Sequence, residues 1–156
     1  MNDKIEEFWS LIISENELLN EKGWKKWDEF NELYPNYTDI FKSYLENDSY
    51  LMYTSINFHD FDIIEVNCSL DRKKAKEVSI CIFDYFNDYK KNLFIRITYT
   101  NVVKYMADVK DIIYSVSWNN DIFEILDDKK IKHRILLSNG SSIEIVCESV
   151  DITVVN

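Results

Sequence analysis

The stretch KIKHRILLSNGSSIEIVCESVDITVV, residues 130–155, decides the fold class. Apolar and polar residues alternate on both sides of Asn139-Gly140, which is typical of strands with one buried face. Both central positions of a type I′ turn need positive φ. The Asn-Gly pair therefore predicts a two-residue hairpin turn between strands of about seven residues. After Cys147 the apolar residues change from odd to even positions, which predicts a bulge or corner near Glu148-Ser149.

The same period of two recurs along most of the chain after residue 49. It is found at 49–58, 63–70, 77–83, 92–100, 112–118 and 122–126. Before residue 49 the period is helical, and it predicts helices at 4–19, 24–34 and 36–48. We therefore expect a single α+β domain over 1–156. Its N-terminal helices, over 1–49, would pack on a mainly antiparallel β-sheet over 50–156, which could curl into a sandwich or half-barrel.

The chain is acidic, with 28 Asp and Glu against 18 Lys and Arg and a net charge of -10. Nucleic-acid binding depends on basic residues that contact phosphates, and anionic membranes also attract cations, so we expect neither as a partner. The start of the chain lacks a basic segment followed by an apolar run, and no window is long and apolar enough to span a membrane. We therefore predict a cytoplasmic protein. The excess of acid is greatest in residues 1–49, which hold twelve acidic and five basic side chains.

The stretch NFHDFDIIEVN, residues 57–67, places His59 beside Asp60 and Asp62 and most resembles a metal or acid–base site. In a strand, His59 would point away from both aspartates, and a metal would need another ligand from elsewhere. Because two buried aspartates would be costly, we interpret the stretch as a turn entering the next strand. An interaction surface and a metal site are the alternatives. His133 alternates with apolar residues and is interpreted as a core or edge histidine.

The three cysteines, Cys68, Cys81 and Cys147, each lie in a strand-like run and form no Cys-x-x-Cys pair. We interpret them as reduced, half-buried thiols. Two glycines are too few for a phosphate-binding loop or a dinucleotide fingerprint, and the serine-hydrolase and zinc-protease motifs are absent from the sequence. We therefore predict a protein that is not an enzyme, with no catalytic residues, no cofactor and no metal ligands.

The order of segments after residue 49 resembles small bacterial immunity proteins of polymorphic-toxin systems. A turn, FHDFDI, leads into a strand; LFIRITYTNVVKYM continues a strand with a hydrophobic segment; and HRILLSNGSSIEIVCESVDIT forms a hairpin with an acidic last strand. These motifs are structural, so the resemblance transfers no functional residue. It implies a cytoplasmic antitoxin encoded beside its toxin.

An acidic chain rich in aromatic residues suits a basic protein partner, because charge steers association and buried aromatic anchors give affinity. The leading hypothesis is a monomer or small homo-oligomer that neutralises a basic toxin or effector through its helices. Its candidate contacts are Glu6, Glu7, Trp24, Trp27, Asp28, Glu29, Glu32 and Asp39. Solvated helix faces, and core packing for the tryptophans, are the competing interpretations of these residues.

Two alternatives come from other functional classes. Long strands with few prolines leave edges that can pair between chains, which would suit a self-associating structural or phage-encoded assembly protein. A metal-dependent enzyme centred on His59, Asp60, Asp62 and His133 is the third hypothesis. Solution mass tests the assembly protein, and metal content tests the metal-dependent enzyme.

Overall fold

The structure is a computed structural model that describes residues 49, 58–71, 74–84, 93–108 and 116–155. The chain divides into two compact units, Met1–Ile40 and Phe41–Asn156, and every described residue belongs to the second. The helices predicted before residue 49 and the strand predicted at 49–58 lie outside the described residues, apart from Ser49 and Phe58.

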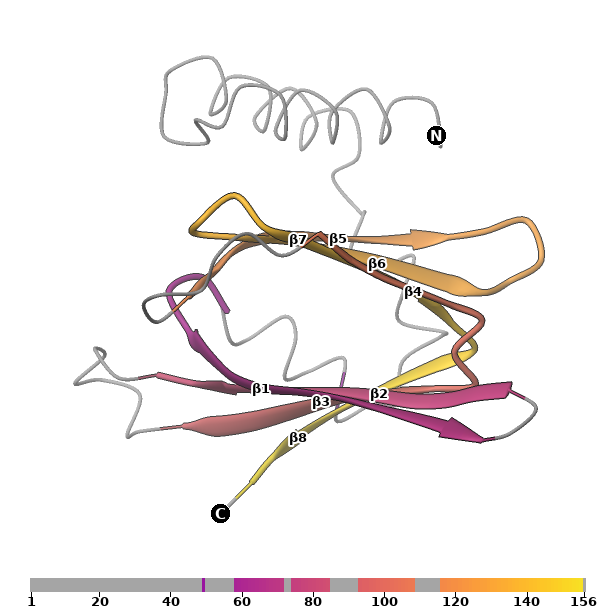
Figure 1. Cartoon of the computed structure of the whole chain (residues 1–156), viewed down its shortest axis with the longest axis horizontal. Coiled ribbons are helices and arrows are strands. Elements are labelled where there is room, and N and C mark those ends of the chain that lie inside the picture. The colour runs from indigo at the N-terminus through magenta and orange to yellow at the C-terminus, as the bar shows by residue number, and fades with distance from the viewer. Residues whose placement is uncertain (1–48, 50–57, 72–73, 85–92, 109–115, 156) are drawn as a thin grey trace. The chain divides into compact units, whose positions relative to one another are not determined.

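The described part is built from strands that form two four-stranded antiparallel sheets (Figure 1). Sheet A has the order β1-β2-β3-β8, with β1 at Asp62–Asp71, β2 at Lys74–Phe83, β3 at Phe94–Thr100 and β8 at Ser149–Val154. Sheet B has the order β4-β7-β6-β5, with β4 at Lys104–Asp108, β7 at Ser142–Cys147, β6 at Ile131–Leu137 and β5 at Trp118–Ile125.

This architecture corrects the predicted fold class. Strands account for 72% of the described residues and no helical element is found among them, so the fold is mainly β. The prediction of an α+β protein with helices packed on a sheet is therefore wrong. The physical reason is that the alternating pattern supplies strands for two sheets, and two facing sheets bury each other's apolar side without a layer of helices.

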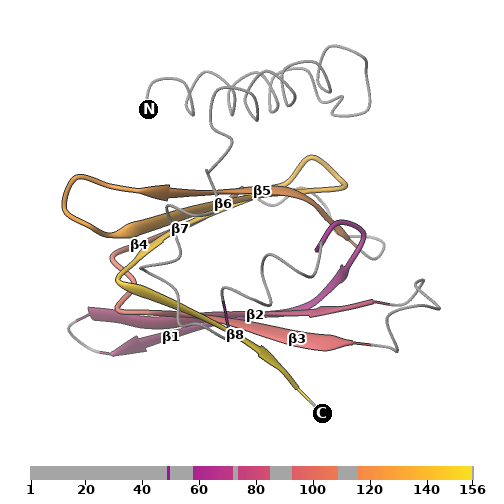
Figure 2. The same ribbon diagram turned by 180° about the vertical axis from the view of Figure 1, so that it is seen from behind.

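The two sheets are joined along both sides. On one side β3 continues into β4 and β7 into β8, so that one pair of strands passes from sheet to sheet (Figure 2). Asn101, with φ of 53°, and Glu148 lie at this corner, and Asn101 Nδ2 donates to Glu148 Oε2 at 2.8 Å. The corner predicted near Glu148-Ser149 is thus confirmed. On the other side, Asp62 at the start of β1 pairs with Ser117.

The core lies between the sheets and is formed by alternate residues of β2, β3 and β8 in sheet A and of β5, β6 and β7 in sheet B. From sheet A it contains Val78, Ile80, Ile82, Ile95, Ile97, Tyr99, Val150 and Ile152, and from sheet B it contains Trp118, Phe123, Ile131, His133, Ile135, Ile143, Ile145 and Cys147, all of them buried. Burial of each large apolar side chain contributes about 1.5–3 kcal/mol. Tyr99 and His133 are the polar members of this set, and they meet at its centre.

The hairpin between β6 and β7 differs from the prediction in its turn. Gly140 N donates to Leu137 O at 3.0 Å, and Leu137 N donates to Ser141 O at 2.8 Å. Gly140 has a positive φ of 78°, whereas Asn139 is not among the described residues with positive φ. The predicted two-residue type I′ turn is therefore wrong, and the bonds fit a three-residue loop in which a left-handed residue follows a type I turn. Asn139 Oδ1 accepts a hydrogen bond from Ser141 N at 2.9 Å, which stabilises this alternative.

The hairpin between β5 and β6 uses the same turn without a glycine. Lys129 N donates to Leu126 O at 2.8 Å, and Lys129 takes the left-handed position with φ of 64°. We expect Lys129→Gly to raise the free energy of unfolding by roughly 0.5–1 kcal/mol in urea denaturation, because glycine avoids the clash of a Cβ at positive φ. Lys129→Ala removes the same charge but keeps the Cβ, so it is expected to give no gain. Equal stabilisation by both variants would contradict the explanation.

Candidate functional site

The stretch that most resembled an acid–base site, around His59, is a turn. Phe61 N donates to Phe58 O at 3.0 Å, and Asp60 has φ of 70°. His59 Nδ1 lies 2.9 Å from Asp60 Oδ2, with side chains 43% and 78% exposed. The predicted turn is confirmed. Asp62 is buried as the first residue of β1, and its burial raises the pKa of its carboxyl. Within the described ranges, no group of three or more His, Cys, Asp and Glu side chains could hold a metal ion.

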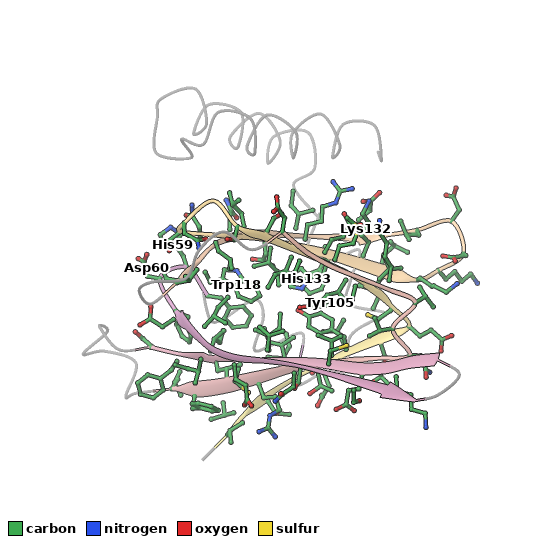
Figure 3. All side chains as sticks on the ribbon, viewed as in Figure 1. His59, Asp60, Tyr105, Trp118, Lys132 and His133 are labelled. Atoms are coloured by element: carbon green, nitrogen blue, oxygen red, sulfur yellow. The ribbon has the colours of Figure 1, made fainter. Side chains whose placement is uncertain are left out.

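A second polar constellation lies inside the core, and its contacts come from three strands. Tyr99 of β3 reaches across from sheet A, and its Oη lies 2.7 Å from His133 Nδ1 on β6. His133 Nε2 lies 2.8 Å from Asp121 Oδ2 on β5. Trp118 Nε1 donates to Asp121 Oδ1 at 3.1 Å. The result is a hydrogen-bonded chain from sheet to sheet. Figure 3 labels two of its members, Trp118 and His133, between the sheets.

Aromatic rings surround the imidazole in this chain. Phe123 stacks on His133 with ring centroids 3.7 Å apart and planes at 15°. The rings of Tyr99 and Trp118 are each tilted, with centroids 5.7 Å from that of His133. His133 is 0% exposed, so neither solvent nor a dissolved substrate reaches it. The sequence predicts that His133 is a core or edge histidine, and its place on the inner strand β6 confirms the first of these.

The partners of His133 define its tautomer. A carboxylate only accepts hydrogen bonds, so Nε2 carries a proton and donates it to Asp121. In a neutral imidazole Nδ1 then accepts from the Tyr99 hydroxyl. Burial raises the pKa of Tyr99 well above its ordinary value, and Cys147 and Asp121 add to this rise, so the phenol keeps its proton and remains a donor. Each nitrogen of His133 is thus engaged by the protein itself, which leaves neither for a metal or a substrate.

The outer face of sheet B holds a cluster of charged side chains with little exposure. Glu124 and Arg134 are 2% and 3% exposed, and Arg134 Nη2 lies 3.9 Å from Glu124 Oε2. Lys132 Nζ lies 3.7 Å from the same oxygen, and Arg134 Nε lies 3.3 Å from Glu144 Oε2. Lys104 Nζ donates to Glu144 Oε1 at 2.7 Å. Mutual pairing offsets the cost of removing these charges from water.

Glu144 shows the electrostatic result of this pairing. Its burial alone would raise the pKa of its carboxyl. The hydrogen bond from Lys104 and the charges of Lys132 and Arg134 outweigh that effect, and they hold the pKa below its ordinary value. Glu144 is therefore ionised at neutral pH. The cluster brings Lys104, Lys132 and Arg134 to Glu124 and Glu144, so its cations outnumber its carboxylates.

The three cysteines are free thiols, as predicted from the sequence. The expectation that all are half-buried is wrong, because Cys68 is exposed whereas Cys81 and Cys147 are buried. Burial raises the pKa of Cys147 to about 12. A thiol reacts through its thiolate.

Because Cys68 is exposed and Cys147 is buried, we expect the two thiols to be alkylated at different rates. We expect iodoacetamide at pH 8 to modify Cys68 in the folded protein, and to modify Cys147 at least about a hundredfold more slowly, because its thiolate is scarce and enclosed. Mass spectrometry of digested protein measures the rates, and denatured protein is the control in which all three cysteines react. Comparable rates at Cys68 and Cys147 in the folded protein would contradict the structure.

Accessible apolar residues gather at one sheet edge. Val103, Tyr105 and Met106 are 58%, 36% and 56% exposed, and each lies in or next to β4. The predicted partner-binding residues cannot be compared with this surface. Glu6, Glu7, Trp24, Trp27, Asp28, Glu29, Glu32 and Asp39 all lie outside the described residues.

The sequence could have indicated part of the buried network. The strand predicted at 122–126 begins instead at Trp118, and a register shift between Trp118 and Asn120 hides the alternation there. With the observed register, Asp121 and Phe123 share the inward face. A lone aspartate among inward positions would have been the signal for a buried partner of His133. No feature of the sequence indicates that Tyr99 is the third member, since it comes from the other sheet.

The described residues form a mainly-β protein of two antiparallel sheets. Hydrogen bonds among Tyr99, His133, Asp121 and Trp118 link the two sheets inside the core. The sequence matches no protein-family profile, and no curated protein matches it. One solved structure is similar: the crystal structure of an uncharacterized protein from Neisseria gonorrhoeae, with 12% identity, covering 62% of this chain and 92% of that one, at a TM-score of 0.36. Among the described residues, no helix is long and apolar enough to cross a membrane.

Proposed function

We propose that this chain is a cytoplasmic, non-enzymatic protein that binds and neutralises a basic protein effector, in the manner of an immunity protein. The observation that supports it is the excess of negative charge among the exposed side chains of the described residues. Eight exposed side chains there are acidic: Asp60, Glu65, Glu77, Asp108, Asp127, Asp128, Glu148 and Asp151. The exposed basic ones are Lys76, Arg96, Lys104 and Lys129.

A surface of this kind recognises a partner through its charge. An excess of negative charge raises the rate at which a positively charged protein arrives, and it disfavours acidic competitors. Steering of this kind weakens with salt, because exposed charges are screened within about 10 Å at 0.1 M ionic strength.

The test compares two variants with equal net charge. In the first, Glu6, Glu7, Asp28 and Glu29 become lysine; in the second, Glu65, Glu77, Asp127 and Asp128 do. The probe is the C-terminal domain encoded by the neighbouring upstream gene, and calorimetry measures its affinity. We expect the first variant to weaken binding by at least about tenfold more than the second, because contacts at the interface add to long-range steering. Unchanged affinity in both variants would contradict the proposal.

A further inference from the structure

Strand β4 is a sheet edge with no strand on its outer side among the described residues. At the edge of sheet A, Ser49 covers β8, since Ile152 N donates to Ser49 Oγ at 2.8 Å. Strands β1 and β5 are joined at their starts by the Asp62–Ser117 bridge, and each contains a register shift. Strand β4 pairs with β7 in an unbroken register, and all five of its residues are exposed.

An open edge offers main-chain groups to another strand. Alternate residues of a strand direct their N–H and C=O groups to opposite sides, so half of those in β4 face away from β7. Native proteins usually protect such edges with bulges, prolines, charged side chains or a covering segment. Strand β4 carries Lys104 and Asp108 at its two ends and presents Tyr105 and Met106 between them, and Val103 precedes the strand.

We propose that β4 pairs antiparallel with β4 of a second copy of this chain, centred on Met106, so that the two copies of sheet B become one continuous sheet. The sequence of the strand, Lys-Tyr-Met-Ala-Asp, is self-complementary in this register. Lys104 lies opposite Asp108 of the partner subunit, and Asp108 lies opposite the partner's Lys104. Met106 meets its own copy across the two-fold axis.

The remaining positions also fit. Tyr105 lies opposite Ala107 of the partner subunit, and a small residue leaves room for the large ring. Asp108 is exposed and has no ion pair within the described part of the chain, so a lysine from a second copy would supply one. Lys104 Nζ already pairs with Glu144. This ion pair holds the ammonium group on the face of β4 that Asp108 shares. The Lys104–Asp108 and Tyr105–Ala107 contacts each occur twice because the pairing is symmetric.

The test is a charge exchange followed by analytical ultracentrifugation from micromolar to millimolar protein. The wild type is expected to dimerise with concentration. Asp108→Lys places lysines opposite lysines, and Lys104→Asp places aspartates opposite aspartates. Each variant alone is expected to weaken dimerisation by at least about tenfold, since like charges directly opposite each other destabilise a strand pair. An equimolar mixture of the two variants is expected to restore it, because every facing pair is then opposite in charge.

The control is Glu77→Lys, which changes an exposed charge on β2 and should leave dimerisation unchanged. A monomeric wild type at every concentration would overturn the proposal, and so would a dimer that survives both single variants. Failure of the mixture to recover dimers would overturn the register. The measurement uses this chain alone, so its result is independent of whether an effector is bound.

Discussion

Replacement of His133 with alanine is expected to lower the free energy of unfolding by about 4 kcal/mol. Loss of a large buried side chain leaves a cavity that costs about 2–5 kcal/mol, here between Phe123 and the rings of Trp118 and Tyr99. The Tyr99 hydroxyl and the Asp121 carboxylate also lose the partner that His133 provides. A buried polar group left without a partner costs about 1–3 kcal/mol, part of which water entering the cavity can restore.

Urea denaturation followed by circular dichroism measures this change, and two variants serve as controls. Tyr99→Phe removes one hydroxyl and is expected to cost about 1–2 kcal/mol. His59→Ala removes the other histidine, which lies in an exposed turn, and is expected to change stability by about 0.5 kcal/mol or less. If His133→Ala cost no more than His59→Ala, the buried network would not stabilise the sandwich.

Replacement of Arg134 with methionine is expected to lower the free energy of unfolding by about 3–5 kcal/mol, because it removes one partner of a buried charge. Glu124 is 2% exposed and would lose its contact with Arg134, while Lys132 at 3.7 Å would be retained. Glu144 would lose its contact with Arg134 Nε. Most of the lost stability is therefore the desolvation cost of the Glu124 carboxylate, which stays buried with less positive charge around it.

A double-mutant cycle separates that cost from the interaction energy between Glu124 and Arg134. The double variant Glu124→Leu/Arg134→Met removes both charges, and we expect it to be less destabilised than the sum of the single variants by about 1–3 kcal/mol. Arg96→Met removes an exposed arginine from β3 and should produce no comparable loss. Strict additivity of the two buried substitutions would contradict the view that Glu124 and Arg134 compensate each other.

Local alternation predicted the strands well because it depends on neighbours in the sequence. The inward positions Val78, Ile80 and Ile82 of β2 follow directly from it, and so does the corner after Cys147. The alternation failed where an extra residue enters a strand. In β1 a register shift between Ile63 and Glu65 places Ile63 opposite Ile82, so Ile64 does not share the inward face with Val66 and is 46% exposed.

Long-range pairing could not be predicted from the same signal. The network joins Tyr99, Asp121 and His133, which lie in different strands and in both sheets. Alternation identifies the inward face of each strand but does not order strands within a sheet, so it could not show which inward residues meet. The same limit explains the error in fold class, because a single sheet covered by helices and two sheets facing each other require the same alternation in each strand.

Neutralisation of a basic effector is what we propose for this chain, and a survival assay measures it in cells. The C-terminal domain encoded by the neighbouring upstream gene would be expressed in cells with and without this chain, and surviving colonies would be counted. We expect the domain alone to be toxic and the chain to restore growth, less effectively when Glu6, Glu7, Asp28 and Glu29 are lysine. A harmless domain, or toxicity that the intact chain does not relieve, would contradict it.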